Sequence, residues 1–294
     1  MQIFRLLALG LMLLVGCTDP TIGSRTPEQG VISPSVSPSP SPPPLVRFAV
    51  KGDWGSGLPE QQLVTEAMCK TRLKEPFDEV VTTGDNFYSP DGVAHDANYF
   101  NPEACLIAHP GHVWKASWGN HDVAGKATAE QLGAPQRYYS WSTSEFDLFV
   151  LDSNRVTDQK QMDWLRSALS ESSAAVKIVV FHHPPFTVGG HSNDLKVQEH
   201  WVPLFVGSGV SLVLNGHNHG FEHSVVEGVH YVVTGGGGAR LYPCLRNEPW
   251  LLRCSAVNHF LIVEVSQGKI KVDAVGIDGV NIDSFTFDAM RLGV

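Results

Sequence analysis

The sequence of 294 residues is short of basic side chains. It has 21 Lys and Arg against 30 Asp and Glu, which gives a formal net charge of -9. A chain that coats nucleic acid concentrates Lys and Arg for the phosphate backbone, so this charge balance argues against a nucleic-acid partner. The chain also lacks a P-loop signature and a G-x-S-x-G motif. Nothing therefore supports a nucleotide-dependent kinase or a serine hydrolase.

Apolar runs long enough to cross a bilayer are also lacking at the N-terminus. The run from Leu6 to Gly16 follows the single Arg5 and is too short to span a membrane, which is typical of a secretory signal peptide. The residues Leu14-Val15-Gly16-Cys17 resemble the bacterial lipoprotein cleavage box. We expect residues 1–16 to be a lipoprotein signal peptide and Cys17 to carry the lipid; the alternative is an ordinary signal peptide that is cut elsewhere.

Residues 17–44 contain repeated Ser-Pro pairs and a run of three prolines, which predicts a semi-extended tether without a core of its own. Residues 45–294 have ordinary globular composition and are expected to form one catalytic domain. Together these segments predict an exported protein that its N-terminal lipid anchors to the bacterial cell envelope, on the periplasmic or the outer-surface face.

Cysteine is scarce, at five residues, and without Cys17 an even number remains: Cys69, Cys105, Cys244 and Cys254. In an exported protein, four cysteines predict two disulfides. Sequence alone leaves three pairings open, of which Cys69 with Cys105 and Cys244 with Cys254 is the simplest. No pair has C-x-x-C spacing, which disfavours a zinc-thiolate or redox site.

Downstream of residue 45, β-type runs alternate with segments whose apolar residues recur at helical intervals, which indicates an α/β fold. The expected strands are 46–50, 79–83, 112–118, 147–151, 176–181 and 210–214, and the expected helices are 61–74, 159–169 and 197–206. After residue 220, closely spaced strands at 230–233, 260–265, 270–274 and 284–287 predict an antiparallel meander.

Several polar residues come just after the predicted strand ends: Asp53, Asp85, Asn120, His182, His217 and His219. In open α/β sheets, ligands bind beyond the carboxyl ends of the strands, so these side chains are expected to face one rim. Each motif alone is weak, because Gly-Asp and Gly-Asn pairs are common in turns. The two imidazoles of Gly216-His217-Asn218-His219 are harder to attribute to a turn, and they indicate metal ligation.

With Tyr88, these residues provide carboxylate, amide, phenol and imidazole ligands, a mixture suited to Fe, Mn or Zn. The number of ligands indicates two metal ions if one carboxylate, Asp85, bridges both. A phenol is a poor ligand for a divalent ion at neutral pH, because its pKa is near 10. Tyr88 therefore favours ferric iron in one of the two positions.

Five blocks occur in order: Gly52-Asp53-Trp54-Gly55, Gly84-Asp85-Asn86-Phe87-Tyr88, Gly119-Asn120-His121-Asp122, Val179-x-x-His182 and Gly216-His217-Asn218-His219. In order and composition the chain resembles the purple acid phosphatases, and among them the short tartrate-resistant type, within the calcineurin-like metallophosphoesterase superfamily. The resemblance extends from Val46 to the C-terminus. It implies a four-layer α/β/β/α sandwich, with two mixed sheets flanked by helices.

The resemblance also implies roles for single residues. Fe(III) would be bound by Asp53, Asp85, Tyr88 and His219, and Fe(II), Zn or Mn by Asp85, Asn120, His182 and His217. His121 and His191 would contact the substrate. His183 directly follows the ligand His182, which favours a structural role over the alternative of ligation. The implied protein is a monomeric acid phosphatase that cleaves small phosphate monoesters by attack of a metal-bound hydroxide.

The chain departs from the family pattern in two places, and two alternative functions stay open. Only residues 152–162 lie between Leu151 and the helix that carries Trp164, which leaves the rim more open than in animal relatives, and residues 234–239 are richer in glycine. A phosphodiesterase or nucleotide-cleaving member is one alternative, although such proteins usually lack the Tyr ligand. A non-catalytic surface binding module is the other, and the presence of His121 and His191 argues against it.

Overall fold

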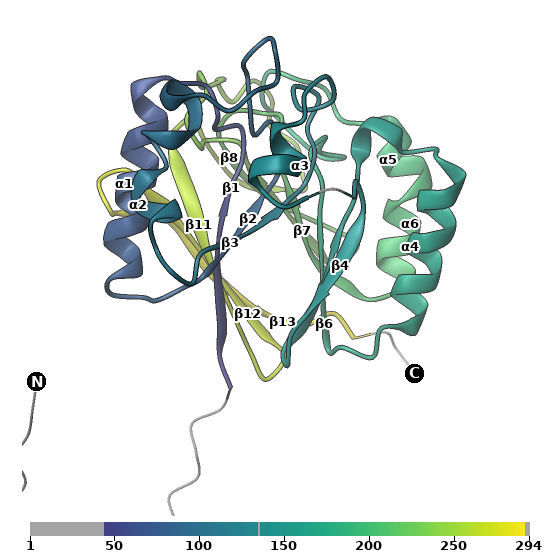
Figure 1. Cartoon of the computed structure of the whole chain (residues 1–294). Coiled ribbons are helices and arrows are strands. Elements are labelled where there is room, and N and C mark those ends of the chain that lie inside the picture. Colours follow the sequence, from purple (N-terminus) through teal and green to yellow (C-terminus); the bar gives the residue numbers. More distant parts are fainter. Residues whose placement is uncertain (1–43, 135, 292–294) are drawn as a thin grey trace, which may run out of the picture. The chain divides into compact units, whose positions relative to one another are not determined.

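A computed structural model describes residues 44–134 and 136–291 (Figure 1). The predicted signal peptide, Cys17 and all but the last residue of the predicted tether lie outside the described residues. Among the helices of the described part, none is both long and apolar enough to cross a membrane.

Two mixed sheets form the centre of the domain. The first has the strand order β13-β12-β11-β1-β2-β3 and the second β10-β8-β9-β7-β6-β5-β4. The strands of the first sheet are β1 (Val46–Lys51), β2 (Glu79–Thr82), β3 (Val113–Ala116), β11 (His259–Ser266), β12 (Lys269–Gly276) and β13 (Asn281–Asp288). Those of the second are β4 (Tyr139–Ser142), β5 (Phe146–Val150), β6 (Val176–Val180), β7 (Val210–Asn215), β8 (Phe221–Val226), β9 (Val229–Thr234) and β10 (Leu251–Ser255).

Helices cover the outer faces of both sheets (Figure 1). The helical segments are α1 (Pro59–Arg72), η1 (Asp96–Phe100), α2 (Ala104–Ile107), α3 (Ala127–Gln131), η2 (Ser153–Arg155), α4 (Gln159–Glu171), α5 (Leu195–His200) and α6 (Val202–Gly207). Apolar residues of α1 pack on the first sheet, and those of α4, α5 and α6 pack on the second. The expected α/β/β/α sandwich is therefore confirmed.

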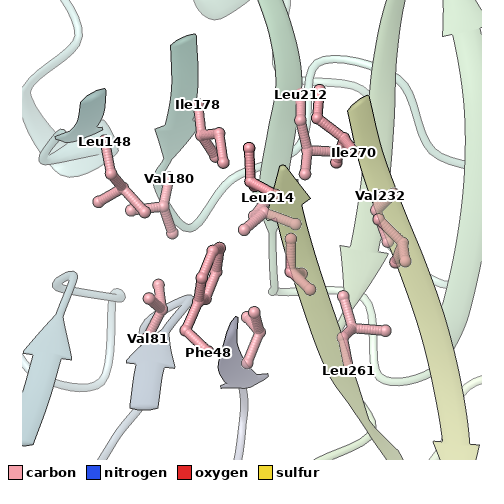
Figure 2. Close-up of a cluster of buried hydrophobic side chains, with 14 of the residues drawn as sticks. Phe48, Val81, Leu148, Ile178, Val180, Leu212, Leu214, Val232, Leu261 and Ile270 are labelled. Carbon is pink, nitrogen blue, oxygen red and sulfur yellow. The ribbon is translucent and has the colours of Figure 1, made fainter. Parts of the chain in front are cut away.

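The main core lies between the two sheets (Figure 2). Phe48 of β1 and Val81 of β2 face Leu148, Val180 and Leu214 of the second sheet, and all five side chains are buried. Strands β6 and β7 are also covered by helices on their outer face, which explains why both are almost continuous apolar runs.

The strands after residue 220 do not form a sheet of their own. Strands β11, β12 and β13 make the expected antiparallel meander, but it extends the first sheet through the pairing of β11 with β1. Strands β8, β9 and β10 instead extend the second sheet. Of these, β8 and β10 were not expected from the sequence, nor was β4.

The prediction of one helix over residues 197–206 is wrong. Two short helices, α5 and α6, meet at Trp201 instead. Pro203 lies in the first turn of α6, where a missing N–H costs nothing, but inside a continuous helix its ring would clash with the preceding turn. Trp201 is fully buried, and its indole N–H donates to the carbonyl oxygen of Val156.

Both disulfides follow the simplest of the three pairings, since Cys69 is bonded to Cys105 and Cys244 to Cys254. The first joins α1 to α2. The second closes the segment between β9 and β10, which passes close to the polar rim described below.

Candidate metal centre

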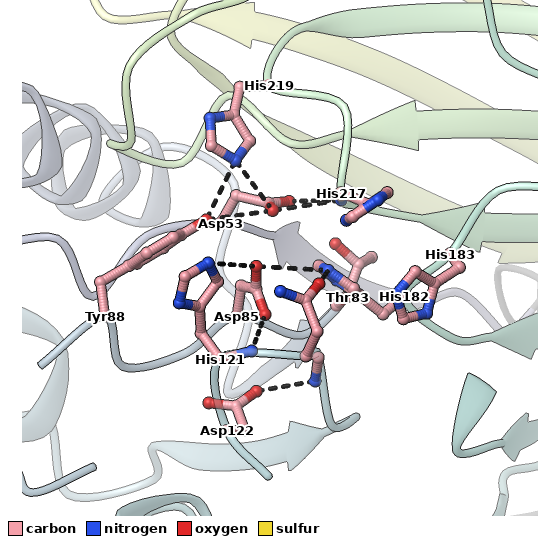
Figure 3. Close-up of polar contacts among 12 residues, drawn as sticks. Asp53, Thr83, Asp85, Tyr88, His121, Asp122, His182, His183, His217 and His219 are labelled. Carbon is pink, nitrogen blue, oxygen red and sulfur yellow. Dashed lines mark hydrogen bonds and ion pairs between the residues drawn. The ribbon is translucent and has the colours of Figure 1, made fainter. Parts of the chain in front are cut away.

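The residues expected to bind metal gather at one rim of the sandwich, where strand ends from both sheets meet (Figure 3). Asp53 and Asp85 follow β1 and β2 of the first sheet, whereas His182 and His217 follow β6 and β7 of the second. The site is therefore assembled only when the two sheets pack together.

The backbone at this rim is strained. Asp53, Asp85 and His217 have φ values of 56°, 50° and 68°, in the left-handed region that side chains rarely adopt. Each such residue costs on the order of 1 kcal/mol or more, and strain of this kind clusters at functional sites. Glycine precedes all three residues, and at Gly216 a Cβ atom would lie 2.5 Å from an Asp53 carboxylate oxygen. Glycine in these Gly-Asp and Gly-His pairs therefore allows the loops to approach one another closely.

One half of the site consists of Asp53, Tyr88 and His219. The Tyr88 hydroxyl lies 3.2 Å from Asp53 Oδ1 and 3.0 Å from His219 Nε2. The His219 Nε2 atom is also 3.4 Å from Asp53 Oδ1. The other ring nitrogen of His219 donates to the carbonyl oxygen of Arg240 at 2.6 Å, which directs Nε2 into the site.

The other half contains Asp85, Asn120, His182 and His217. The His182 Nε2 atom lies 3.0 Å from Asn120 Oδ1 and 3.3 Å from Asp85 Oδ2. The opposite ring nitrogen, Nδ1, donates to the Thr83 carbonyl oxygen at 2.9 Å. Ligand atoms of Asp53, Asp85 and His182 lie within 4.8 Å of one another, which is compact enough to hold a metal ion.

The two carboxylates at the centre are buried, and no Lys or Arg of the described residues pairs with them. Asp53 and Asp85 are 0% and 2% exposed, and in the described part of the chain histidines alone form ion pairs with them. Burial alone would raise the pKa of Asp85, but the charge of His182 and its hydrogen bond outweigh burial and hold that pKa well below its usual range. Burial by itself would lower the pKa of His182, but the negative charge of Asp85 outweighs burial and raises the pKa of His182 to about 9. Such a cluster requires positive charge, from a proton on His182 or from a metal ion that displaces it.

The Tyr88 phenol fits a highly charged cation. Burial, reinforced by the negative charges of Asp53 and Asp85, raises the pKa of Tyr88 well above its ordinary value. A phenolate would therefore form here only beside a strongly charged ion. The donor set of this half matches the composition expected for a trivalent ion.

Three further histidines surround these two halves. The His121 side chain is 48% exposed, with Nε2 3.9 Å from Asp85 Oδ2, and its ring lies 4.4 Å from that of Tyr88. The His191 ring stacks on His217 at 4.0 Å between centroids. His183 instead contacts Ser153 of η2, with Nδ1 2.8 Å from the hydroxyl oxygen, although its ring also lies 4.5 Å from that of His217.

Asp122 is a site residue to which the sequence assigned no role. Its buried carboxylate accepts N–H bonds from Gly119 at 2.7 Å, from Asn86 at 3.0 Å and from Phe87 at 3.2 Å. It thereby links the loop after β3 to the loop after β2. Its place within the Gly-Asn-His-Asp block was the available signal. Tyr242, whose ring stacks on His219 at 4.3 Å, carried no signal in the sequence.

The glycine-rich residues 235–238 pack on the Asp53 loop. The Gly237 amide donates to the Gly52 carbonyl oxygen, and the Ala239 amide donates to that of Asp53, both at 2.9 Å. Side chains at these glycines would collide with this loop or with neighbouring residues, so the additional glycines provide close packing.

An α/β/β/α sandwich with histidine, carboxylate and amide groups converging at its strand ends defines the metallophosphoesterase class. The chain belongs to the calcineurin-like phosphoesterase family, whose model matches residues 46–221.

Its relatives include two purple acid phosphatases of Arabidopsis thaliana. Purple acid phosphatase 17 is 31% identical over 65% of this chain and 68% of its own length. Purple acid phosphatase 3 is 29% identical over 65% of this chain, and the match spans only 63% of its length.

Solved structures share the fold. GAP50, the anchor in the inner membrane complex of Plasmodium, has a TM-score of 0.75 at 20% identity, covering 84% of this chain and 90% of its own. The purple acid phosphatase PPD1 of yellow lupin (Lupinus luteus) has a TM-score of 0.70 at 19% identity, covering 86% of this chain and 55% of its own.

Proposed function

We propose that this protein is a binuclear-metal acid phosphatase that hydrolyses small phosphate monoesters. The observation that carries this proposal is the convergence of ligand-type side chains around two buried carboxylates, which pair with histidines alone among the described residues. The strained backbone at Asp53, Asp85 and His217 supports it, because such strain is retained where a site requires it. The relatives named as purple acid phosphatases point to the same chemistry.

The two halves of the site would hold two different ions. Fe(III) fits the half with the phenol, formed by Asp53, Asp85, Tyr88 and His219, and Fe(II), Zn or Mn fits the half formed by Asp85, Asn120, His182 and His217. When bound, the ions supply positive charge for the phosphate and lower the pKa of a coordinated water.

The remaining residues would act on the substrate. The His121 ring lies next to Tyr88, and the His191 ring lies next to His217. As hydrogen-bond donors they would bind nonbridging phosphate oxygens, and a protonated imidazole would supply the proton to the departing alkoxide. Asp122 would keep the loops of Asp85 and Asn120 in register.

The test is metal analysis of the purified protein together with turnover of phosphomonoesters and phosphodiesters across pH. We expect two metal ions per chain, one of them iron, and faster turnover of monoesters. Preference for diesters would support the phosphodiesterase alternative, and metal-loaded protein without turnover of either class would refute catalysis.

A substitution at Asp85 tests whether this residue bridges both ions or binds only one of them. We expect Asp85→Ala to lose both metals, and the matched control Asp163→Ala, whose side chain on α4 is 63% exposed, to keep both. Loss of a single ion from Asp85→Ala would contradict the bridging role.

We also propose that the protein is exported and anchored by a lipid on Cys17. Membrane fractionation of cells that express Cys17→Ser tests this proposal. Release of the protein into the soluble fraction is expected, and unchanged membrane association would refute the lipid anchor.

A further inference from the structure

A segment between β9 and β10, residues Arg240 to Arg246, contacts both sides of the site, and we call it the strap. On the His219 side, the Arg240 carbonyl oxygen accepts the Nδ1 proton, and the Tyr242 amide donates to the His219 carbonyl oxygen at 2.8 Å. The Tyr242 ring then stacks on His219 with an interplanar angle of 11°. The strap therefore fixes both the tautomer and the plane of this imidazole.

The strap also holds the loop that carries His191. The guanidinium of Arg246 donates through Nη2 to the carbonyl oxygens of His191 at 2.8 Å, Thr187 at 3.2 Å and Gly189 at 3.3 Å. The Leu245 amide donates to the Val188 carbonyl oxygen at 2.9 Å. One side chain thus gathers three carbonyl groups of a single loop.

Other residues hold the opposite side of this loop. The His191 amide donates to Asn218 Oδ1 at 2.7 Å, and the Val188 amide donates to Glu222 Oε2 at 2.8 Å. Glu222 is buried, and its other carboxylate oxygen accepts from the Thr187 hydroxyl at 2.9 Å. The amides of His191 and Val188 therefore have partners of their own. Arg246 provides partners for three carbonyl groups of the loop, and the His191 carbonyl oxygen also accepts a longer contact from Asn218 Nδ2 at 3.4 Å.

The His191 ring depends on this backbone support. Within residues 44–134 and 136–291 no hydrogen bond reaches its ring nitrogens, and the ring packs against the rings of His217 and Tyr242. Its two backbone groups, by contrast, are held by Asn218 and Arg246. The place of the imidazole is consequently set by the backbone of the loop and by packing on these two rings, and not by a hydrogen bond from a side chain.

We propose that Arg246 is a positioning residue that acts through His191. It holds the loop so that the His191 imidazole faces the phosphate group, and the disulfide between Cys244 and Cys254 ties the strap to β10. This inference rests on the proposed phosphatase function. Lysine keeps the positive charge but lacks the planar guanidinium group whose Nη2 atom makes all three contacts, so it replaces Arg246 only in part.

A double-mutant cycle on metal-loaded protein tests the inference, with wild type, Arg246→Ala, His191→Ala and the double variant. Misplacement of a substrate-contacting group can cost up to about 100-fold in rate, and we expect Arg246→Ala to lower kcat/KM on the order of tenfold. In the His191→Ala background the same change should cost less than about twofold, because the group it positions is already gone.

Arg253→Ala is the matched control. Arg253 lies on β10, the strand that follows the strap, and its exposed side chain makes no hydrogen bond or ion pair among the described residues. The Arg253→Ala change therefore removes the same charge without touching the loop. We expect it to leave kcat/KM unchanged. If the alanine variant loses metal, Arg246→Lys takes its place in the cycle. We expect Arg246→Lys to lower kcat/KM by less than the tenfold expected for Arg246→Ala.

Equal losses in both backgrounds, or an equal loss in Arg253→Ala, would overturn the positioning role. If metal-loaded wild type hydrolyses no phosphomonoester, the proposed function has failed, and the same cycle is then measured as binding of inorganic phosphate by calorimetry. Coupling between Arg246 and His191 in phosphate affinity would support the positioning role, and additive losses would refute it.

Discussion

The buried ion pair between Lys51 and Glu103 leads to a prediction about stability that does not depend on activity. Lys51, the last residue of β1, is 0% exposed, and its Nζ atom lies 2.8 and 2.9 Å from the two carboxylate oxygens of Glu103. The ammonium group also donates to the Thr65 hydroxyl at 3.1 Å and lies 4.4 Å from the centroid of the Trp54 ring. Burial lowers the pKa of Lys51, and the attraction of Glu103 opposes that effect.

Glu103→Ala leaves the ammonium group buried without its counter-ion. Removing one partner of a fully buried pair typically costs about 3–5 kcal/mol, so the unfolding free energy should fall by that amount. For a domain of this size each kcal/mol corresponds to about 2–4 °C in Tm, which gives a decrease of roughly 6–20 °C. The double variant Lys51→Met/Glu103→Leu should recover much of this loss, because no charge then remains buried.

Denaturant unfolding and thermal scans at fixed metal saturation measure these effects. Glu199→Ala, which removes a 74% exposed carboxylate from α5, is the control and should stay within about 0.5 kcal/mol of wild type. A loss below about 1 kcal/mol for Glu103→Ala, or a double variant no more stable than Glu103→Ala, would refute the reasoning.

The remaining predictions concern the phenol, a disulfide and a buried histidine. If Tyr88 binds Fe(III), purified protein should show a broad visible charge-transfer band that Tyr88→Phe lacks; a colourless, iron-replete, active wild type would contradict the ferric assignment. Cys69→Ser/Cys105→Ser opens a loop with a sequence separation of 36 residues, and chain entropy gives a loss of about 4 kcal/mol by denaturant unfolding; a loss below about 1 kcal/mol would count against this estimate. Burial lowers the pKa of His259 from 6.5 to about 4, so its contribution to stability is complete above pH 6.5 and is lost as pH falls toward 4. Between pH 4 and pH 6.5, the slope of unfolding free energy against pH should be smaller in His259→Gln, by the amount that corresponds to about one bound proton. An unchanged slope would contradict the buried neutral state of His259.

Much of the fold could be predicted because local patterns reflect the element that each segment forms. Strands β1, β2, β6 and β7 were expected within a residue or two of their observed ends, because their apolar runs are bounded by turn residues. The short edge strands β4 and β10 were missed, since a half-exposed edge strand has little apolar signal. The break between α5 and α6 was missed because the apolar periodicity continues across Trp201, although Pro203 was visible in the sequence.

The sequence by itself determined which chemical groups are present and where they lie along the chain. The five motif blocks contain every residue proposed to bind metal, and each follows a strand whose apolar pattern can be recognised locally. Within each sheet their convergence could be expected, because the carboxyl ends of parallel strands meet at one edge. The meeting of the edges of the two sheets was decided by their packing.

Only the tertiary structure decided how distant segments complete the site. The strap with Tyr242 and Arg246, the Asp122 carboxylate between two loops and the Lys51–Glu103 pair all depend on contacts between residues far apart in sequence. Such contacts form only after β9 and β10 have joined the second sheet and α2 has packed on the first, and no local propensity specifies them. The sequence therefore determined the proposed ligand set, and the packing of the sheets decided which other side chains hold it in place.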